Sequence, residues 1–311
     1  MKKALQSIAN MKDVSIKTML HQRMPYTEVG RGFELLHAST VTKEDYEFCP
    51  REAALQLLSK KEPKKRFIST SLNITFSMGR AIQEYLNNEW LADVMVGDWV
   101  CASCGYRKSF SRKPKTKCSC GVDLWRYEEH RILSPYSDIG GGIDGFVAVE
   151  DDQKLRVLEV KTMGKDMFKS LSAPMSEHRL RTNLYLRLLD EAGYSDVVNT
   201  KVGHVLYIVK GFGVKDTEIV KQKGVKDSAF SPFKEYKVKR DDSVTENLVQ
   251  SARALKVFRE TGKIPCGVCP TGLCSRAQKC SMVKECFSGQ YPQQITWKKD
   301  GVPLHAGKEV V

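Results

Sequence analysis

The sequence predicts an α/β protein whose mixed central sheet is flanked by helices. Apolar and polar residues alternate over residues 143–149 and again over 155–161, and the short turn between them indicates an antiparallel hairpin. Residues 175–191 carry leucines at four-residue intervals, which is typical of a helix, and a third alternating segment follows at 204–210. Because a helix between two strands is the connection that joins parallel neighbours, we expect both strand directions in one sheet.

Two further helices are predicted from the spacing of their apolar residues. One is expected over 79–93, because Ile82, Leu86 and Trp90 recur at helical intervals and define a buried face. Another is expected over 245–260, just before a cysteine-rich segment. Together with the helix of the crossover, these two would flank the sheet.

The chain is predicted to divide into a main domain, two terminal segments and an insertion. Residues 1–40 form an N-terminal helical extension, residues 41–290 the main domain, and residues 291–311 a tail. Residues 97–124 interrupt the main domain, because the helical pattern stops there and a segment rich in glycine, proline, lysine and cysteine begins.

The composition indicates a basic globular protein. The 311 residues include 50 lysines and arginines against 37 aspartates and glutamates, a formal charge of +13, which favours an anionic partner. With 41% hydrophobic and 28% charged residues, general disorder is excluded. No stretch approaches the roughly 18 consecutive apolar residues of a membrane span, so we expect a soluble protein without membrane attachment. The ten cysteines are grouped, which in a reducing cytoplasm favours metal binding over disulfides.

The sharpest pattern combines two carboxylates with a lysine. Asp144 follows three glycines, and Glu159 and Lys161 lie two residues apart on the next predicted strand, where they share one face. The Val160 carbonyl lies between them, and Asp144 is within reach from the hairpin partner. Two carboxylates and a carbonyl are hard oxygen ligands for Mg²⁺ or Mn²⁺, and an adjacent ammonium can orient water or stabilise charge on phosphate. The alternative is a surface ion pair, with Asp144 as a turn residue.

In these motifs the sequence resembles the RecB-like nucleases of the PD-(D/E)xK superfamily. The resemblance is strongest to the iron–sulfur exonucleases related to the CRISPR-associated and AddB nucleases and their phage-encoded relatives, and it runs from about Cys49 to Phe287. It implies a restriction-endonuclease-like core over residues 41–290. It also implies a nuclease that depends on Mg²⁺ or Mn²⁺ and acts on DNA ends or single strands.

The resemblance assigns roles to the acidic strand pair. The aspartate of the family corresponds to Asp144, and its Glu-x-Lys motif corresponds to Glu159 and Lys161. By this resemblance, Asp144, Glu159 and the Val160 carbonyl would hold the Mg²⁺ or Mn²⁺ ion. Lys161 would position or activate the attacking water.

Two positions depart from the pattern of the family. Gln83 stands where the family has a metal-binding histidine, and Arg181 stands where the family has a glutamine four residues before a tyrosine, here Tyr185. Gln83 would assist the metal through its carbonyl oxygen, with a weaker affinity than an imidazole, and Arg181 with Tyr185 would arrange the phosphate. The alternatives are a surface glutamine and an arginine paired with an acid on its own helix.

Four cysteines inside the insertion have the spacing of a structural zinc site. Cys101 and Cys104 form one turn and Cys118 and Cys120 the other, and each turn ends in a glycine that gives the backbone the freedom to close. We therefore expect a zinc ribbon. The loop between the turns, residues 107–117, carries six positive charges around one phenylalanine, which is typical of either a solvated face or a surface that follows phosphates.

Five more cysteines cluster near the C-terminal end of the main domain: Cys266, Cys269, Cys274, Cys280 and Cys286. The resemblance implies a [4Fe-4S] cluster bound by one cysteine before the core and three after it. The first would be Cys49, at the start of a helix that favours its thiolate, and the others would be Cys274, Cys280 and Cys286, with Cys269 as the alternative to Cys274. Such a cluster would close residues 269–286 onto the N-terminal side of the domain. The alternative is a second zinc site made from Cys266, Cys269, Cys274 and Cys280.

The leading prediction is a DNA exonuclease of recombination, repair or DNA degradation in a bacterial or phage-infected cell. The ribbon loop and the basic residues 221–240 would guide the DNA electrostatically. One rival is a catalytically weak or inactive DNA-binding or recombination accessory protein that keeps the nuclease fold, and another is a redox-sensing iron–sulfur DNA binder. The chain has no Gly-x-x-x-x-Gly-Lys-Ser/Thr loop, so a helicase or a recombinase is a candidate partner and not a built-in activity.

Overall fold

The structure, a computed structural model, describes residues 16–29, 32–43, 47–59, 65–149, 153–211 and 231–288. The chain separates into two compact units, residues 1–32 with 62–82, and residues 33–61 with 83–311. The first unit contains α2 (Ile16–Arg23), β1 (Tyr26–Val29), β3 (Lys65–Ile68) and most of α5 (Thr70–Tyr85). Its two strands pair antiparallel. Within the same unit, the Asn73 side chain donates a hydrogen bond of 2.8 Å to the Met24 carbonyl.

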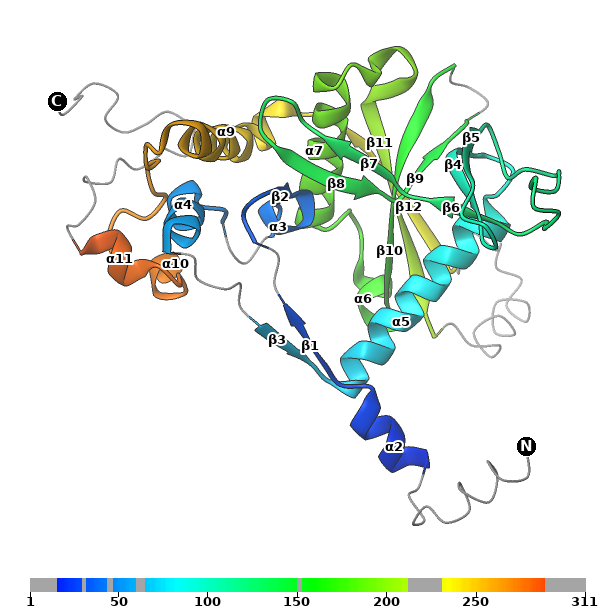
Figure 1. Ribbon diagram of the computed structural model, residues 1–311, viewed down its shortest axis with the longest axis horizontal. Coiled ribbons are helices and arrows are strands. Elements are labelled where there is room, and N and C mark those ends of the chain that lie inside the picture. Colours follow the sequence, from blue (N-terminus) through cyan, green and yellow to red (C-terminus); the bar gives the residue numbers. More distant parts are fainter. Residues whose placement is uncertain are drawn as a thin grey trace. The chain divides into compact units, whose positions relative to one another are not determined.

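The second unit is built on a seven-stranded sheet with the order β12-β11-β10-β9-β4-β5, and β6 pairs with β4 beside this path (Figure 1). Its strands are β4 (Met95–Cys101), β5 (Arg107–Phe110), β6 (Trp125–Glu128), β9 (Gly145–Val147), β10 (Leu155–Gly164), β11 (Val198–Lys210) and β12 (Phe233–Lys239). Strands β10 and β11 are parallel, and the other pairs are antiparallel. The predicted mixed sheet with flanking helices is therefore confirmed.

The crossover helix α7 (Ser176–Glu191) packs on β10 and β11 (Figure 1). Its leucines form the centre of the core, and Leu184, Leu186 and Leu188 have no exposed surface. The helix lies close to β11 because that strand carries Gly203, where a Cβ atom would come within 2.6 Å of Thr182 Cγ2. The chain leaves the helix through a glycine with φ of 81°, a left-handed conformation that glycine adopts without strain.

A second, three-stranded sheet has the order β2-β8-β7. It consists of β2 (Leu36–His37), β7 (His130–Leu133) and β8 (Ile139–Ile143), and β7 with β8 forms a hairpin that the sequence pattern did not predict. Strand β8 carries three consecutive glycines, so its pattern lacks the alternation by which strands are recognised.

The remaining helices of the second unit are α3 (Ala38–Val41), α4 (Pro50–Ser59), α6 (Lys165–Ser170), α9 (Glu246–Thr261), α10 (Ser275–Gln278) and α11 (Val283–Phe287), with 3₁₀ turns at Tyr194–Asp196 and Asp242–Val244. Helix α4 packs against α9 and α11, which places the two ends of the unit side by side (Figure 1). Within the described parts of the chain, no helix combines the length and the apolar character that crossing a membrane requires.

The predicted helix over 79–93 differs from the structure at both ends. Helix α5 begins earlier, at Thr70, and continues into a π-helix over Leu86–Trp90, where the Leu91 amide donates to the Leu86 carbonyl. The wider π turn rotates the following residues, so that positions four apart no longer share a face. Leu86 is buried, but Trp90 is 57% exposed, and its predicted place on the buried face is wrong.

Candidate active site and metal centres

The glycines of β8 allow two side chains to approach its backbone closely. A Cβ atom at Gly141 would lie 2.9 Å from the ring and hydroxyl oxygen of Tyr185, and a Cβ atom at Gly142 would lie 2.7 Å from Glu129 Oε2. Strand pairing breaks immediately afterwards at Asp144, between β8 and β9. Because the glycines have no side chains, Tyr185 and Glu129 can lie against this strand, next to Asp144.

Asp144, Glu159 and Lys161 meet at one point. The Lys161 ammonium lies 2.6 Å from Glu159 Oε1, 2.8 Å from the Val160 carbonyl oxygen and 3.3 Å from Asp144 Oδ2. Asp144 Oδ2 also accepts a hydrogen bond of 2.7 Å from the Val160 amide, which fixes its carboxylate against β10. The side chains of Glu159 and Asp144 are 2% and 12% exposed. Three oxygens thus surround a single cationic nitrogen in a nearly dry site.

The contacts of the Lys161 ammonium indicate that the site suits a hard metal ion. The lysine ammonium is itself a cation, and it contacts the same three oxygens that the sequence suggests as Mg²⁺ or Mn²⁺ ligands. Two carboxylates and a carbonyl that converge on one positive charge form an appropriate donor set for such an ion. Burial lowers the pKa of Lys161, but the carboxylates of Asp144 and Glu159 outweigh it and raise the pKa, so the side chain stays protonated.

Arg181 and Tyr185 approach the same point from α7. Arg181 Nη1 lies 3.3 Å from Glu159 Oε1, and Arg181 Nη2 lies 3.3 Å from Glu177 Oε1 on the same helix. The arginine is therefore paired with an acid of its own helix, as in the alternative interpretation, and also with the site itself. Tyr185 is 2% exposed, and burial raises the pKa of its hydroxyl, so the phenol remains protonated.

Gln83 contacts an acid that the sequence interpretation missed. Its amide Nε2 donates to Glu129 Oε1 at 3.1 Å, while the neighbouring Asn87 donates from Nδ2 to the Asp144 carbonyl at 3.2 Å. Partial burial and the Asp144 carboxylate raise the pKa of Glu129, and the Lys161 ammonium opposes them. Glu129 directly precedes β7, whose His130 pairs with Ile143, so continuing that register sets Glu129 opposite Asp144. Recognition of this hairpin in the sequence would have found the residue.

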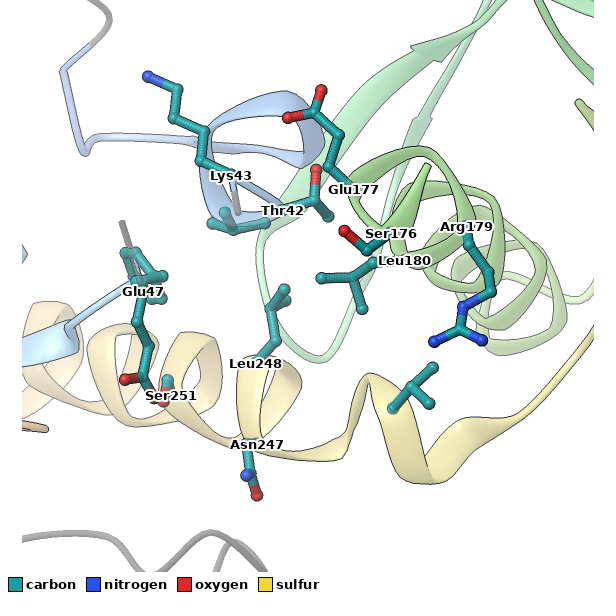
Figure 2. A pocket seen from close by; sticks show the side chains of 13 residues that line it. Thr42, Lys43, Glu47, Ser176, Glu177, Arg179, Leu180, Asn247, Leu248 and Ser251 are labelled. Carbon is teal, nitrogen blue, oxygen red and sulfur yellow. The ribbon is translucent and has the colours of Figure 1, made fainter. Parts of the chain in front are cut away.

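A pocket of about 400 Å³ lies next to Arg181, which contacts two of its lining residues. It is lined by the end of α3 and the segment after it, by the first turns of α7 and by the start of α9 with the turn before it (Figure 2), and its charged residues are Lys43, Glu47, Glu177 and Arg179. Thr42 and Glu177 belong to the pocket, and both contact Arg181, at 3.4 Å and 3.3 Å. The pocket therefore offers space beside the acidic site, with mixed charge.

The four cysteines of the insertion come together. The sulfur atoms of Cys101, Cys104, Cys118 and Cys120 all lie within 4.8 Å of one another. Gly105 and Gly121 adopt φ values of 74° and 85°, which confirms the need for glycine at both turns. Backbone amides lower the pKa of Cys101 to about 6 and also lower that of Cys118. The Tyr106 amide lowers the pKa of Cys104 too, but the Cys118 thiol and burial outweigh it and raise that pKa to about 12. This group can bind a metal, either as a zinc ion or as an iron–sulfur cluster.

A second set of cysteines lines a small pocket between α4 and the C-terminal helices: Cys49, Cys269, Cys280 and Cys286. The Cys274 sulfur instead accepts a hydrogen bond from the Ala277 amide and caps α10. Glu52 pairs with Arg276 at 2.7 Å across this pocket and holds its two walls together. Among the described residues, this set is not one of the groups whose ligand atoms all lie within 4.8 Å of one another.

The acid–base state of Cys49 differs from the sequence-based expectation. The start of α4 was expected to favour its thiolate, but burial dominates and raises the pKa of this thiol. The nearby Arg276 guanidinium opposes the effect of burial. A bound metal would therefore have to displace a proton from Cys49.

Comparisons with known proteins add little to this description. The chain matches no protein-family model, and no curated protein matches it. Among solved structures it is similar to the crystal structure of LHK-Exo in complex with dAMP, with a TM-score of 0.39 and 12% sequence identity. That similarity covers 73% of this chain and 89% of the other. The residues of the site must therefore support any conclusion about function.

Proposed function

We propose that this protein is a metal-dependent nuclease that hydrolyses phosphodiester bonds of DNA at ends or in single strands, with a RecB-like PD-(D/E)xK core. The observation that carries the proposal is the convergence of Asp144, Glu159 and the Val160 carbonyl on the Lys161 ammonium. Phosphodiester hydrolysis needs a metal cation to meet the phosphate and a donor to hold the attacking water, and this site has oxygen ligands for the first and an ammonium for the second.

Each residue of the site has a role in this proposal. Asp144, Glu159 and the Val160 carbonyl would hold Mg²⁺ or Mn²⁺, which supplies Lewis-acid stabilisation of the charge that develops on the phosphate. Because the raised pKa keeps Lys161 protonated, its ammonium acts as a hydrogen-bond donor that orients water and not as a general base.

The α7 residues support the acids in this proposal. Arg181 touches Glu159 and is only 13% exposed, so it would fix the Glu159 carboxylate, and together with Tyr185 it would arrange the phosphate. Tyr185 is a protonated donor packed against the glycine strand. In this proposal Glu129 takes the role of the histidine that the resembling family has at position 83. Glu129 faces the Asp144 side of the site, and Gln83 orients it.

DNA would approach over the cysteine ribbon. Two of its loop cations are held in ion pairs, Arg107 with Glu128 and Lys113 with Glu89. The other four are exposed: Lys108, Arg112, Lys115 and Lys117. Lys108 also lies over the Phe110 ring, at 5.4 Å from its centroid. These exposed cations support phosphate binding with a strong salt dependence. In the second basic segment, residues 221–230 lie outside the described part, and Arg240 is held by Asp190 and Asp242.

The two groups of cysteines support different proposed metals. We propose zinc for the ribbon cysteines, because four sulfurs within 4.8 Å suit a single tetrahedral ion. We propose a [4Fe-4S] cluster for Cys49, Cys280, Cys286 and Cys269, with Cys269 chosen over Cys274 because it lines the shared pocket. Purified protein is expected to be brown and to contain iron and zinc, and a colourless protein containing only zinc would reverse the second assignment.

The experiment that tests the function is cleavage of labelled single-stranded DNA by the purified protein with Mg²⁺, with Mn²⁺ or with EDTA. We expect degradation only with a metal, and labels at either end give the polarity. The second candidate is a DNA-binding accessory protein without activity, favoured by the engagement of Arg181 with two acids. It predicts DNA binding without cleavage in every metal, and binding that Asp144→Asn leaves unchanged.

A further inference from the structure

A groove of about 900 Å³ lies on the face of the sheet opposite α7, and we call it the back-face groove. Its floor includes Leu158 on β10 and Leu206 on β11. Successive strand residues point to opposite faces, and Glu159 points toward Arg181 of α7, so Leu158 points away from that helix. The groove is therefore separated from the acidic site by the sheet itself.

Most of the groove is apolar, and two of its aromatic residues are accessible. Ten of its fourteen lining residues are apolar, among them Trp90 and Phe233, which are 57% and 39% exposed. Their rings pack edge to face with centroids 6.1 Å apart. The π-helix turns Trp90 outward, and π-helical turns are frequent at functional sites. An apolar hollow with an exposed tryptophan at its rim has the composition of a binding hot spot.

The polar residues of the groove form a row across three strands. Arg156 on β10 lies 3.1 Å from His204 on β11, measured from Nη1 to Nε2. The other ring nitrogen of His204 pairs with Glu235 on β12. Lys237 stands opposite His204 in the register of β11 with β12. Arg156, Lys237 and Glu235 give this row two positive charges and one negative charge, so it favours a carboxylate in an otherwise apolar hollow.

We propose that the back-face groove binds a peptide segment of a partner protein, one that carries large apolar side chains flanked by carboxylates. The apolar anchors would pack on Leu158, Leu206 and Trp90, and a carboxylate would meet Lys237 and Arg156. A nucleic-acid strand fits less well, because it needs cations along its whole path, and here they are confined to one row. An occupant on this face leaves the acidic site open, so the docking role does not depend on the nuclease activity.

The test is selection of binders from a random library of displayed twelve-residue peptides on the full-length protein. Enriched peptides are then synthesised with a fluorescent label and titrated by anisotropy. We expect enrichment of peptides with at least two large apolar residues and an excess of carboxylates. Their affinity should fall at least tenfold in Trp90→Ala and at least fivefold in Lys237→Glu, with DNA cleavage unchanged in Trp90→Ala.

Two control variants separate docking from general surface effects. Tyr136→Ala removes a ring with the same 57% exposure away from the groove, and Lys201→Glu reverses an exposed lysine elsewhere on β11. Both should bind the peptides like wild type. The proposal is overturned if no peptide is enriched, if the enriched peptides are neutral or basic, or if Trp90→Ala binds them as tightly as wild type. Weaker binding of a labelled oligo(dT) by Trp90→Ala, with no peptide selected, would make the groove a nucleic-acid site.

Discussion

Replacement of Lys161 by methionine separates the two cations that the acidic site can hold. In the protein without metal, the ammonium is the shared partner of Asp144, Glu159 and the Val160 carbonyl, at 2.6 to 3.3 Å. Lys161→Met keeps most of the apolar side chain and removes the charge. Two nearly buried carboxylates then face each other, with only Arg181 left beside Glu159.

The expected loss follows from these contacts. Removal of one partner of a buried ion pair costs about 3–5 kcal/mol, and because Arg181 remains beside Glu159 we expect the lower end, about 3 kcal/mol. In the variant, Mn²⁺ at a hundred times its dissociation constant would add about 2.7 kcal/mol, which restores nearly the whole loss. In wild type the ion competes with the ammonium for the same oxygens. We therefore expect Mn²⁺ to bind the variant at least tenfold more tightly than wild type, which corresponds to about 1.4 kcal/mol of binding free energy.

The assay is urea unfolding of both proteins at neutral pH, first in EDTA and then across a Mn²⁺ titration. Lys210→Met is the matched control, since Lys210 is a partly buried lysine at the end of the adjacent strand β11. The control should lose less than about 1 kcal/mol. The reasoning is refuted if Lys161→Met is as stable as wild type in EDTA, or if Mn²⁺ stabilises wild type and the variant equally.

Three further predictions follow from the site and its surroundings. Burial lowers the pKa of His178 to about 3, despite Glu177 at 3.5 Å, so the folded protein keeps this ring neutral at pH values where the unfolded chain protonates it. The free energy of unfolding of wild type should therefore fall by about 2 kcal/mol between pH 7 and pH 5 because of this group. In urea unfolding at these two pH values, the free energy of unfolding of His178→Gln should fall by about 2 kcal/mol less than that of wild type. Glu129→Gln should lower the rate of DNA cleavage at least tenfold, and Gln83→Ala should lower it less, because Gln83 only orients Glu129. Equal losses of rate in the two variants would contradict this prediction. Cys118→Ser should lose the ribbon metal, as measured by elemental analysis, while iron content and visible absorption stay at the wild-type level.

The sequence was sufficient to predict secondary structure where a regular pattern of apolar residues coincides with burial. The leucines of 175–191 and the alternating strands on either side define a helix and two parallel strands, and these pack as predicted. Trp90 was placed on the wrong face because helical spacing assumes a constant turn, and a π-helix changes it. No local sequence pattern predicts the hydrogen bond between residues five apart that defines the π-helix.

The site was partly predictable for the same reason. Asp144, Glu159 and Lys161 are brought together by strand alternation and a hairpin, both of which are local. Glu129 was missed because it depends on a second hairpin whose glycine strand has no alternation. Likewise, the sequence interpretation preferred Cys274 to Cys269 as the third ligand, whereas the packing of the C-terminal helices on α4 places Cys269 at the shared pocket.

The most direct test of the proposed function is the rate of DNA degradation by Asp144→Asn compared with wild type, over a titration of Mn²⁺. Asp166→Asn, which changes an exposed aspartate on α6, is the control. We predict that wild type and the control degrade labelled DNA only when metal is present, and that Asp144→Asn is slower by a factor on the order of a hundred or more at every Mn²⁺ concentration. Degradation by Asp144→Asn at the wild-type rate would contradict the assignment of this site.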